Sequence, residues 1–421
     1  MTFQLRSSGM SGRRRRASPA MMLLGPLLLA GCATPPASPT LSLRRLAFAD
    51  LAGWQQDHVG EILPVLLAEC ERLGRLPVET PLLDPPQPGP STDGTSTAQP
   101  PATEAPDAVE AAAHAGLYRP ACRAARALPS DDDATVRRYL ETWFLPYEAS
   151  DRGDVQANLT GYFEPEVAGA LSESPDTPVP VYARPRDLVT LANPQPGQPA
   201  VTGRAQAGKV VPYLTRAEID QGALRGRNLE ILWLHSPIDL FFMQVQGAGR
   251  VRLPTGQIVR LGYAGRNGQP YTPLGRVLID RHQLDPSGVS MQSIRGWLET
   301  HPADAQDLLE QNRNYVFFRA LDDLAPNQGP PGALGLALTP QRSAAVDRRF
   351  IPLGVPMFVE TTLPSGAPLD RLMLAQDLGT DVVGPTRADL FFGWGADAAR
   401  NAGAMHAGGR IILLLPRQPA T

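Results

Sequence analysis

Two aspartates near the C-terminal end of the sequence stand where a carboxyl group can transfer a proton. Asp377 ends the run Leu372–Gln376, and Asp389 opens the apolar run Leu390–Phe392. An aspartate beside apolar strand residues is costly to ionise, so its pKa rises and it can donate a proton near neutral pH. Either residue can instead cap a turn or pair with an arginine, because structural ion pairs also perturb pKa values. Residue chemistry alone therefore leaves both roles open.

The sequence lacks the patterns of several common catalytic sites. Its six histidines show no metal-ligand spacing, and neither H-E-x-x-H nor G-x-S-x-G occurs. Gly393–Ala398 matches G-x-G-x-x-A, but only residues 399–421 follow, too few to complete a dinucleotide-binding βαβ unit. We therefore expect neither a metal nor a cofactor.

The charge balance argues against a nucleic-acid partner. The whole chain carries a formal net charge of −3, and without the five arginines of residues 1–31 the remainder carries −8. This composition supplies no basic surface of the kind that nucleic acid requires. The 43% hydrophobic content indicates a globular protein of more than one domain, and the 44 prolines and 39 glycines favour short strands and turns.

Residues 1–31 have the pattern of an export signal. The basic run Arg13–Arg16 precedes the apolar stretch Met21–Ala30, which is shorter than the roughly 20 residues of a membrane-spanning helix. A buried apolar segment is the alternative, but the arginine run would have no partner in a core. The following Leu29-Ala30-Gly31-Cys32 resembles the lipobox of bacterial lipoproteins, which implies that Cys32 is acylated.

This resemblance also implies a location. Ala33, which is not acidic, follows the cysteine, as in lipoproteins sorted to the outer membrane of Gram-negative bacteria. We expect a periplasmic protein anchored to the outer membrane through Cys32, with residues 32–40 as a tether. Cys70 and Cys122 then remain in an oxidising compartment, either as a disulfide or as two buried thiols. We predict the disulfide.

Hydrophobic periodicity predicts a mainly β architecture with short helices. Helical patterns occur at 51–73, 117–128 and 132–143, and the proline-rich residues 84–107 form an insertion that we expect to be disordered. The strand candidates are 159–165, 230–234, 240–246, 251–253, 258–263, 315–319, 355–360, 371–377, 389–392 and 410–415. Short helices are expected at 215–222, 275–281, 293–301 and 396–405.

Six motifs, in order along the chain, resemble the membrane-bound lytic murein transglycosylase A family. They are LTGYFEP (159–165), FFMQVQGAGR (241–250), YAGRNGQPY (263–271), NRNYVFFR (312–319), GALGLALTPQRSAAVDRRFIPLG (332–354) and AQDLGTDVVGPTRAD (375–389). One departure adds negative charge: the family's Gly-Gly-Ala-Ile-Lys after the middle aspartate is replaced by residues 379–383, GTDVV, so a lysine is lost and Asp381 appears.

The resemblance implies a double-psi β-barrel with N-terminal helices and a second β domain inserted within it. The implied boundaries are 41–165 for the N-terminal helical part and first barrel segment, 166–320 for the inserted domain that forms the other wall of a groove, and 321–421 for the second barrel segment. Asp389 is implied as the catalytic acid, with Asp377 and Asp347 in support. Arg342 and Asp347 can alternatively form an internal ion pair.

Residues of sugar-binding types stand within the same motifs. They are Tyr162, Glu164, Gln244, Gln246, Arg250, Asn267 and Tyr271, each of which can instead be a core or turn-stabilising residue.

The implied activity is cleavage of the β-1,4 bond between N-acetylmuramic acid and N-acetylglucosamine in a peptidoglycan glycan strand, leaving a 1,6-anhydro end. Because the sugar's own 6-hydroxyl is the nucleophile, one aspartate can act as acid and then as base. The alternatives are a non-catalytic polysaccharide-binding lipoprotein and a water-using glycoside hydrolase, which would need a second carboxylate such as Asp377 or Glu164. Other cell-wall enzymes are conceivable partners, but no motif identifies one.

Overall fold

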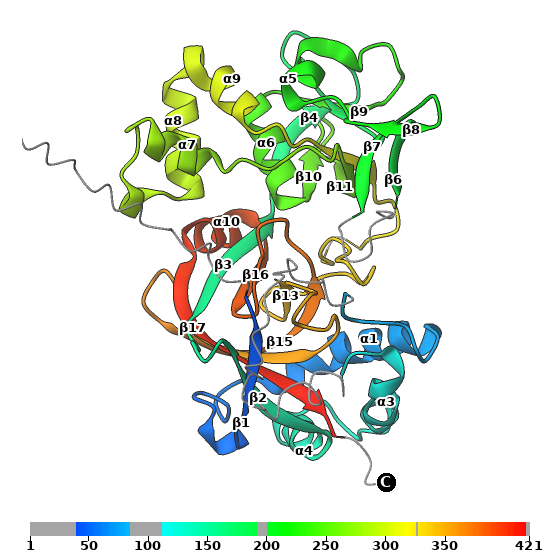
Figure 1. Ribbon diagram of the computed structural model, residues 1–421, viewed down its shortest axis with the longest axis vertical. Coiled ribbons are helices and arrows are strands. Elements are labelled where there is room, and N and C mark those ends of the chain that lie inside the picture. The colour runs from blue at the N-terminus through cyan, green and yellow to red at the C-terminus, as the bar shows by residue number, and fades with distance from the viewer. Residues whose placement is uncertain (1–38, 85–111, 192–199, 326, 418–421) are drawn as a thin grey trace, which may run out of the picture. The chain divides into compact units, whose positions relative to one another are not determined.

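The computed structural model describes residues 39–84, 112–191, 200–325 and 327–417 (Figure 1). The expected signal peptide, Cys32, nearly all of the tether and nearly all of the proline-rich insertion lie outside the described residues. Within these ranges, no helix is long and apolar enough to cross a membrane. Strands and short helices alternate along the chain, so the expected mainly β class is confirmed.

Three helices that precede the barrel strands in the sequence pack together. They are α1 (Leu63–Arg75), α3 (Arg119–Arg126) and α4 (Asp133–Trp143). Asp132 caps α4, because its side chain accepts a hydrogen bond from the Thr135 N–H at 2.9 Å. A disulfide joins Cys70 on α1 to Cys122 on α3 and ties the two helices together.

The helix predicted over residues 51–73 begins only at Leu63, so this prediction was wrong in its first half. Gly53 has a φ of +69°, outside the helical region, and the 3-10 turn Val59–Ile62 leads into α1. The buried Asp57 carboxylate accepts hydrogen bonds from Arg342 and from the Leu372 N–H. The apolar spacing therefore reflects a turn that packs against the barrel, not a continuous helix.

Six strands close into a barrel. They are β3 (Ala157–Glu164), β13 (Ser343–Val346), β14 (Pro356–Thr362), β15 (Pro368–Asp377), β16 (Arg387–Trp394) and β17 (His406–Pro416). The order is β17-β14-β15-β13-β16-β3, and β3 pairs back with β17, which removes free edges. The strands β2 (Phe144–Asp151) and β1 (Leu41–Arg45) extend the sheet beyond β17.

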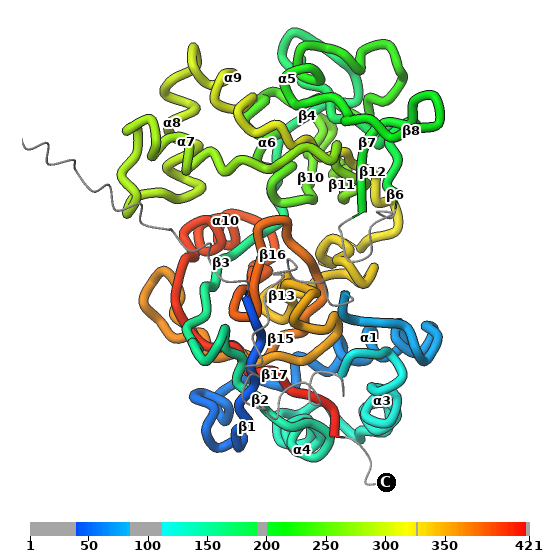
Figure 2. The backbone as a smooth tube through the Cα atoms, viewed as in Figure 1, coloured from blue at the N-terminus to red at the C-terminus, as the bar shows by residue number. Residues whose placement is uncertain are grey.

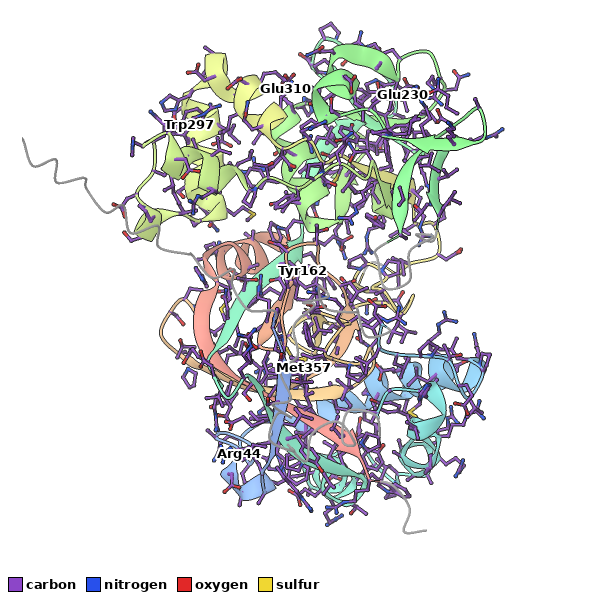
Figure 3. All side chains as sticks on the ribbon, in the orientation of Figure 1. Arg44, Tyr162, Glu230, Trp297, Glu310 and Met357 are labelled. Atoms are coloured by element: carbon purple, nitrogen blue, oxygen red, sulfur yellow. A yellow bond between two sulfur atoms is a disulfide. The ribbon has the colours of Figure 1, made fainter. Side chains whose placement is uncertain are left out.

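The barrel and the N-terminal helices share one hydrophobic core. Leu66 of α1, Leu140 of α4, Leu159 of β3 and Met357 of β14 are all buried in it, and Figure 3 labels Met357. The helix α10 (Gly395–Ala404) contacts β3 and β16. A Cβ at Gly161 would lie 2.8 Å from the Ala402 Cα, so only glycine permits this close packing of α10 on β3.

The chain leaves the barrel where β3 passes, across Pro165, into β4 (Figure 2). A second six-stranded sheet follows, with the order β12-β11-β10-β4-β9-β5. Its strands are β4 (Glu166–Ala170), β5 (Val179–Tyr182), β9 (Glu230–Leu234), β10 (Ala248–Arg252), β11 (Ile258–Arg266) and β12 (Val316–Ala320). A bridge between Ala183 and Phe318 brings the end of β5 back to β12, so this sheet also curls.

The inserted part of the chain also contains a smaller sheet and several helices. The smaller sheet contains β6 (Leu188–Leu191), β7 (Val201–Gln206) and β8 (Lys209–Val211). The helices are α5 (Arg216–Glu218), α6 (Pro237–Gln246), α7 (Leu274–Asp280), α8 (Met291–Thr300) and α9 (Pro302–Gln311).

The strand predicted over residues 240–246 is the helix α6, so that prediction was wrong. Ser236 caps its N-terminus by accepting from the Ile238 N–H at 3.1 Å, and Gly247, at φ +76°, ends it. The segment is apolar on several sides because α6 lies between two cores. Leu240 and Met243 pack against the sheet, whereas the next helical face packs against α7–α9. An all-round apolar helix has the same local pattern as a buried strand.

Candidate active site

Four residues on four adjacent barrel strands form a row. Ala345 on β13 pairs with Asp377 on β15 and with Asp389 on β16, and Asp389 in turn pairs with Thr160 on β3. Residues directly opposite one another in a sheet project from the same face. The small side chain of Ala345 therefore separates two carboxyl groups that point to the same side.

Asp389 is the partly buried acid at the centre of this row. Thr160 Oγ1 donates a hydrogen bond of 2.6 Å to its Oδ1. Burial raises the pKa of Asp389 to about 6, against the lowering effects of the Thr160 hydrogen bond and of the Arg387 charge. The negative charges of Asp381 and Asp377 push the pKa in the same direction as burial. A carboxyl group in this state can both donate and accept a proton near neutral pH.

Asp377 is held by two donors. The Tyr162 hydroxyl donates to Oδ2 at 3.0 Å, and the Ala333 N–H donates to Oδ1 at 3.1 Å. Burial raises the pKa of Asp377 to about 6 despite these hydrogen bonds. Figure 3 labels Tyr162, which projects from β3 two residues beyond Thr160. Burial and the charge of Asp377 raise the pKa of the Tyr162 hydroxyl well above its usual value, so this hydroxyl stays a donor.

Both carboxyl groups line a cleft with about 660 Å³ of open space. The barrel contributes Tyr162, Ala345, Asp377, Leu378, Gly379, Thr380, Asp381 and Asp389. The inserted domain contributes Arg216, Gln244, Val245, Gln246, Tyr271, Asn312, Asn314 and Val316. The cleft therefore has one acidic wall and one wall rich in amides, the composition that hydrogen-bonds neutral polyhydroxylated ligands.

Four of the predicted sugar-binding residues line the cleft, namely Tyr162, Gln244, Gln246 and Tyr271. Two of them already use their side-chain oxygens. Gln244 Oε1 accepts from Arg216 Nη2 at 2.6 Å, and Gln246 Oε1 accepts from the Phe163 N–H at 2.9 Å. Burial, followed by the charge of Asp381, raises the pKa of Tyr271 to about 12.

Three other predicted residues lie outside the residues that line the cleft. Glu164 is fully buried and forms ion pairs of 2.8 Å with both Arg250 and Arg260. Arg250 also lies over the Trp394 ring, 4.2 Å from its centroid, and so links β10 to the end of β16. Asn267 is fully buried and hydrogen-bonds backbone groups. The polar atoms of Glu164 and Asn267 are therefore already bonded to neighbouring residues. A sequence pattern cannot reveal such contacts.

Asp347 stands at the end of β13 and does not line the cleft. Its Oδ2 accepts from the Gly384 N–H at 2.7 Å, and its carboxylate pairs with Arg349. It thereby holds the loop that connects Asp377 to Asp389. The alternative pairing of Asp347 with Arg342 was wrong, because Arg342 points toward the segment just before α1 and pairs there with Asp57 and Glu61.

The sequence analysis did not single out Thr160, which hydrogen-bonds Asp389, or the cleft residues Ala345, Arg216 and Asn314. Thr160 lies within LTGYFEP and Asn314 within NRNYVFFR, so the motifs contained both, but threonine and asparagine are common in turns and strands and carry no distinguishing local signal. Among the residues that the structure describes, no group of three or more His, Cys, Asp or Glu side chains could hold a metal ion.

A closed barrel with two carboxyl groups at a cleft, whose other wall is a β domain inserted after the first barrel strand, defines a recognisable class of double-psi barrel protein. The sequence matches the family described as the MltA specific insert domain over residues 158–319 and the 3D domain over residues 342–415.

Named relatives identify the family within that class. The chain is 33% identical over 316 residues to the membrane-bound lytic murein transglycosylase A of Vibrio cholerae, covering 71% of this chain and 76% of that protein. The crystal structure of the membrane-bound lytic murein transglycosylase from Agrobacterium tumefaciens superimposes with a TM-score of 0.74 at 32% identity, covering 89% of this chain and 98% of that one. The chain belongs to the membrane-bound lytic murein transglycosylase A family, which confirms the resemblance seen in the sequence.

A third similar structure holds a sugar. It is the crystal structure of E. coli MltA with bound chitohexaose, which superimposes with a TM-score of 0.57 at 28% identity and covers 72% of this chain and 83% of that chain.

Proposed function

We propose that this protein is a peptidoglycan lytic transglycosylase that cleaves the β-1,4 bond between N-acetylmuramic acid and N-acetylglucosamine and leaves a 1,6-anhydro end. The single observation that carries the proposal is Asp389, a carboxyl group with a pKa of about 6 in a cleft between an acidic and an amide-rich wall. The bound chitohexaose of E. coli MltA supports a glycan strand as the ligand of this cleft.

In this mechanism Asp389 acts first as acid and then as base. Protonated Asp389 donates its proton to the glycosidic oxygen as the bond to the anomeric carbon breaks. The carboxylate that results takes the proton of the same sugar's 6-hydroxyl, whose oxygen bonds to the anomeric carbon and closes the anhydro ring. Atoms balance without water. Thr160 stabilises the ionised form of Asp389 between these two steps, through its hydrogen bond to Oδ1.

The other two aspartates have supporting roles in this proposal. Asp377 lies two strands away from Asp389, a backbone separation of about 10 Å at a strand spacing of about 4.8 Å. Its charge favours positive charge at the anomeric carbon. Asp347 acts at a distance, because it holds Gly384 in the loop between the two carboxyl groups.

A water-using hydrolase is the second candidate function, and the observation that favours it is the presence of Asp377 in the same cleft. Such an enzyme needs a second carboxylate to attack the sugar or to activate water. Both oxygens of Asp377 accept hydrogen bonds from the protein, which favours a fixed electrostatic role for this residue. Glu164 does not qualify, since both of its oxygens pair with buried arginines.

Digestion of purified cell-wall sacculi tests the proposal. Mass spectrometry of the products should show 1,6-anhydro ends; reducing ends would establish the hydrolase, and unaltered sacculi a binding protein. Asp389→Ala should lower the rate of product release at least 1,000-fold, on the order of the loss of a principal catalytic group. The exposed Asp397 on α10, changed to alanine, is the matched control and should keep the full rate.

We also propose that the mature protein is anchored to the outer membrane on its periplasmic side by lipid on Cys32. The lipobox-like residues 29–32 support this proposal. The Cys32→Ser protein should then move from the membrane fraction to the soluble periplasmic fraction; retention on the membrane would require a different anchor.

A further inference from the structure

The amide-rich wall of the cleft contains a buried acceptor that accepts nothing. Asn314 lies two residues before β12, is 7% exposed, and lines the same cleft as Asp389. Its side-chain Oδ1 has no hydrogen-bond partner among the described residues. Buried polar atoms in native proteins are almost always paired, because an unmade hydrogen bond destabilises the folded state. An orphaned acceptor in a ligand cleft therefore indicates that a ligand supplies the donor.

The backbone of Asn314 is rigidly held. Its N–H donates to Asn312 Oδ1 at 3.2 Å, and its carbonyl accepts from Arg216 Nη2 at 2.9 Å. Arg216 is itself fixed by the Phe241 and Tyr315 rings, with its guanidinium carbon 5.0 and 5.2 Å from their centroids. The backbone position from which the Asn314 side chain projects is thus set before any ligand arrives.

Asn267 holds the residues on either side of Asn314. Its Nδ2 donates to the Arg313 carbonyl at 2.9 Å, and its Oδ1 accepts from the Tyr315 N–H at 2.9 Å. The neighbouring Gln244 side chain is likewise bound by the protein: its Oε1 accepts from Arg216 and its Nε2 donates to the Val316 carbonyl. Unlike the side-chain oxygens of Gln244 and Asn267, Asn314 Oδ1 projects from a held backbone and has no partner among the described residues, the arrangement of a ligand contact on a preorganised frame.

We propose that Asn314 is a substrate-binding residue whose Oδ1 accepts a hydrogen bond from an N–H or O–H group of the sugar bound in the cleft. This inference rests on the proposed glycan substrate and deepens it, because it assigns a specificity-determining contact to the wall opposite the catalytic acid. An acetamido N–H and a ring hydroxyl have the same donor chemistry.

Calorimetric titration of the whole mature protein with chitohexaose tests the contact. The nearly isosteric Asn314→Leu should bind about ten-fold more weakly than the natural protein, the effect of losing one well-placed hydrogen bond. Tyr118→Phe is the matched control, since the Tyr118 hydroxyl is also buried without a partner but does not line the cleft. Its affinity should be unchanged.

A thermal melt without sugar separates a binding role from a structural one. Because Asn314→Leu removes an unpaired polar atom, its Tm should equal or exceed that of the natural protein, whereas a structural role would lower it. Should the leucine variant misfold, Asn314→Ala removes the same oxygen with less bulk and carries the binding test.

Cellohexaose, which lacks acetamido groups, distinguishes the two donors. A loss of affinity confined to chitohexaose assigns the acetamido N–H, and an equal loss with both sugars assigns a hydroxyl. Unchanged chitohexaose affinity in both Asn314 variants would overturn the inference while leaving the proposed function standing. Conversely, sacculi that stay intact while chitohexaose binding depends on Asn314 would overturn the activity and keep the contact.

Discussion

Thr160 and Asp389 are linked through both their backbones and their side chains. They pair across β3 and β16, and the Thr160 hydroxyl donates a 2.6 Å hydrogen bond to Asp389 Oδ1. The strand pairing fixes the distance between their backbones, so the hydrogen bond needs no side-chain rearrangement. Burial raises the pKa of Asp389, and this hydrogen bond is the largest effect that opposes the rise.

Thr160→Val should therefore move the pH profile of kcat/KM. An acid catalyst is active while protonated, so the rate falls as pH rises through its pKa of about 6. Without the hydrogen bond the ionised form is less stable, the pKa rises further, and the alkaline limb should move up by about one pH unit. The strand residue Thr190 on β6, changed to valine, should leave the profile in place. An unchanged alkaline limb in Thr160→Val would mean that this hydroxyl does not affect the pKa of the group that sets the limb.

Two charges near Asp389 should move the same limb in opposite directions. Asp381 raises the pKa of Asp389, so Asp381→Asn should shift the limb to lower pH. Arg387 lowers that pKa, so Arg387→Gln should shift the limb to higher pH. Each shift should be roughly half a pH unit, and smaller in high salt because Asp381 is exposed. Shifts of the same sign in both variants would contradict this electrostatic account.

Glu164→Gln should destabilise the protein strongly without changing the cleft's chemistry. The substitution leaves the guanidinium groups of Arg250 and Arg260, each 6% exposed, without their shared counter-charge. Breaking such a buried pair costs about 3–5 kcal/mol of unfolding free energy, measurable by urea denaturation. Glu166→Gln removes the neighbouring exposed pair with Arg252 and should cost less than about 1 kcal/mol. Equal losses in the two variants would refute a structural role for Glu164.

We expect the buried Glu69 to make the free energy of unfolding fall as the pH rises. Its carboxyl is buried beneath the barrel, where burial raises its pKa well above the ordinary 4.5 and Gln376 Nε2 donates to it at 3.0 Å. The folded protein therefore keeps a proton that the unfolded chain releases, so this contribution to stability is full below about pH 4.5 and is lost as the pH rises toward the folded pKa.

Glu69→Gln should remove that loss. The variant's unfolding free energy should gain on the natural protein by up to about 1.4 kcal/mol per pH unit above pH 4.5. Denaturation midpoints at pH 4.5, 6 and 7.5 measure the difference. The exposed Glu71, paired with Arg75, provides the control: Glu71→Gln should show no such pH-dependent gain. A constant difference at all three values would mean that Glu69 is ionised in the folded protein.

The sequence alone determined the strand-rich class and the family, and it singled out Asp389 as the candidate acid, because alternating apolar residues and contiguous motifs are local features. It also indicated the Cys70–Cys122 disulfide, since compartment and cysteine number restrict the possible pairings. Local patterns failed where two environments produce the same pattern. The sequence of α6 has the pattern of a buried strand because the helix is apolar toward two cores. The turn before α1 has a helical spacing of apolar residues because it packs on the barrel.

Tertiary structure alone decided which polar residues are free to meet a ligand. Glu164 and Asn267 have sugar-binding side chains, but residues far along the chain occupy their polar atoms. Asn314 looks ordinary in sequence, and only the surrounding contacts leave its oxygen without a donor. The row of Asp377, Ala345 and Asp389 likewise exists only through strand register. Hydrogen bonding and burial depend on neighbours in space, so the order of residues does not encode them locally.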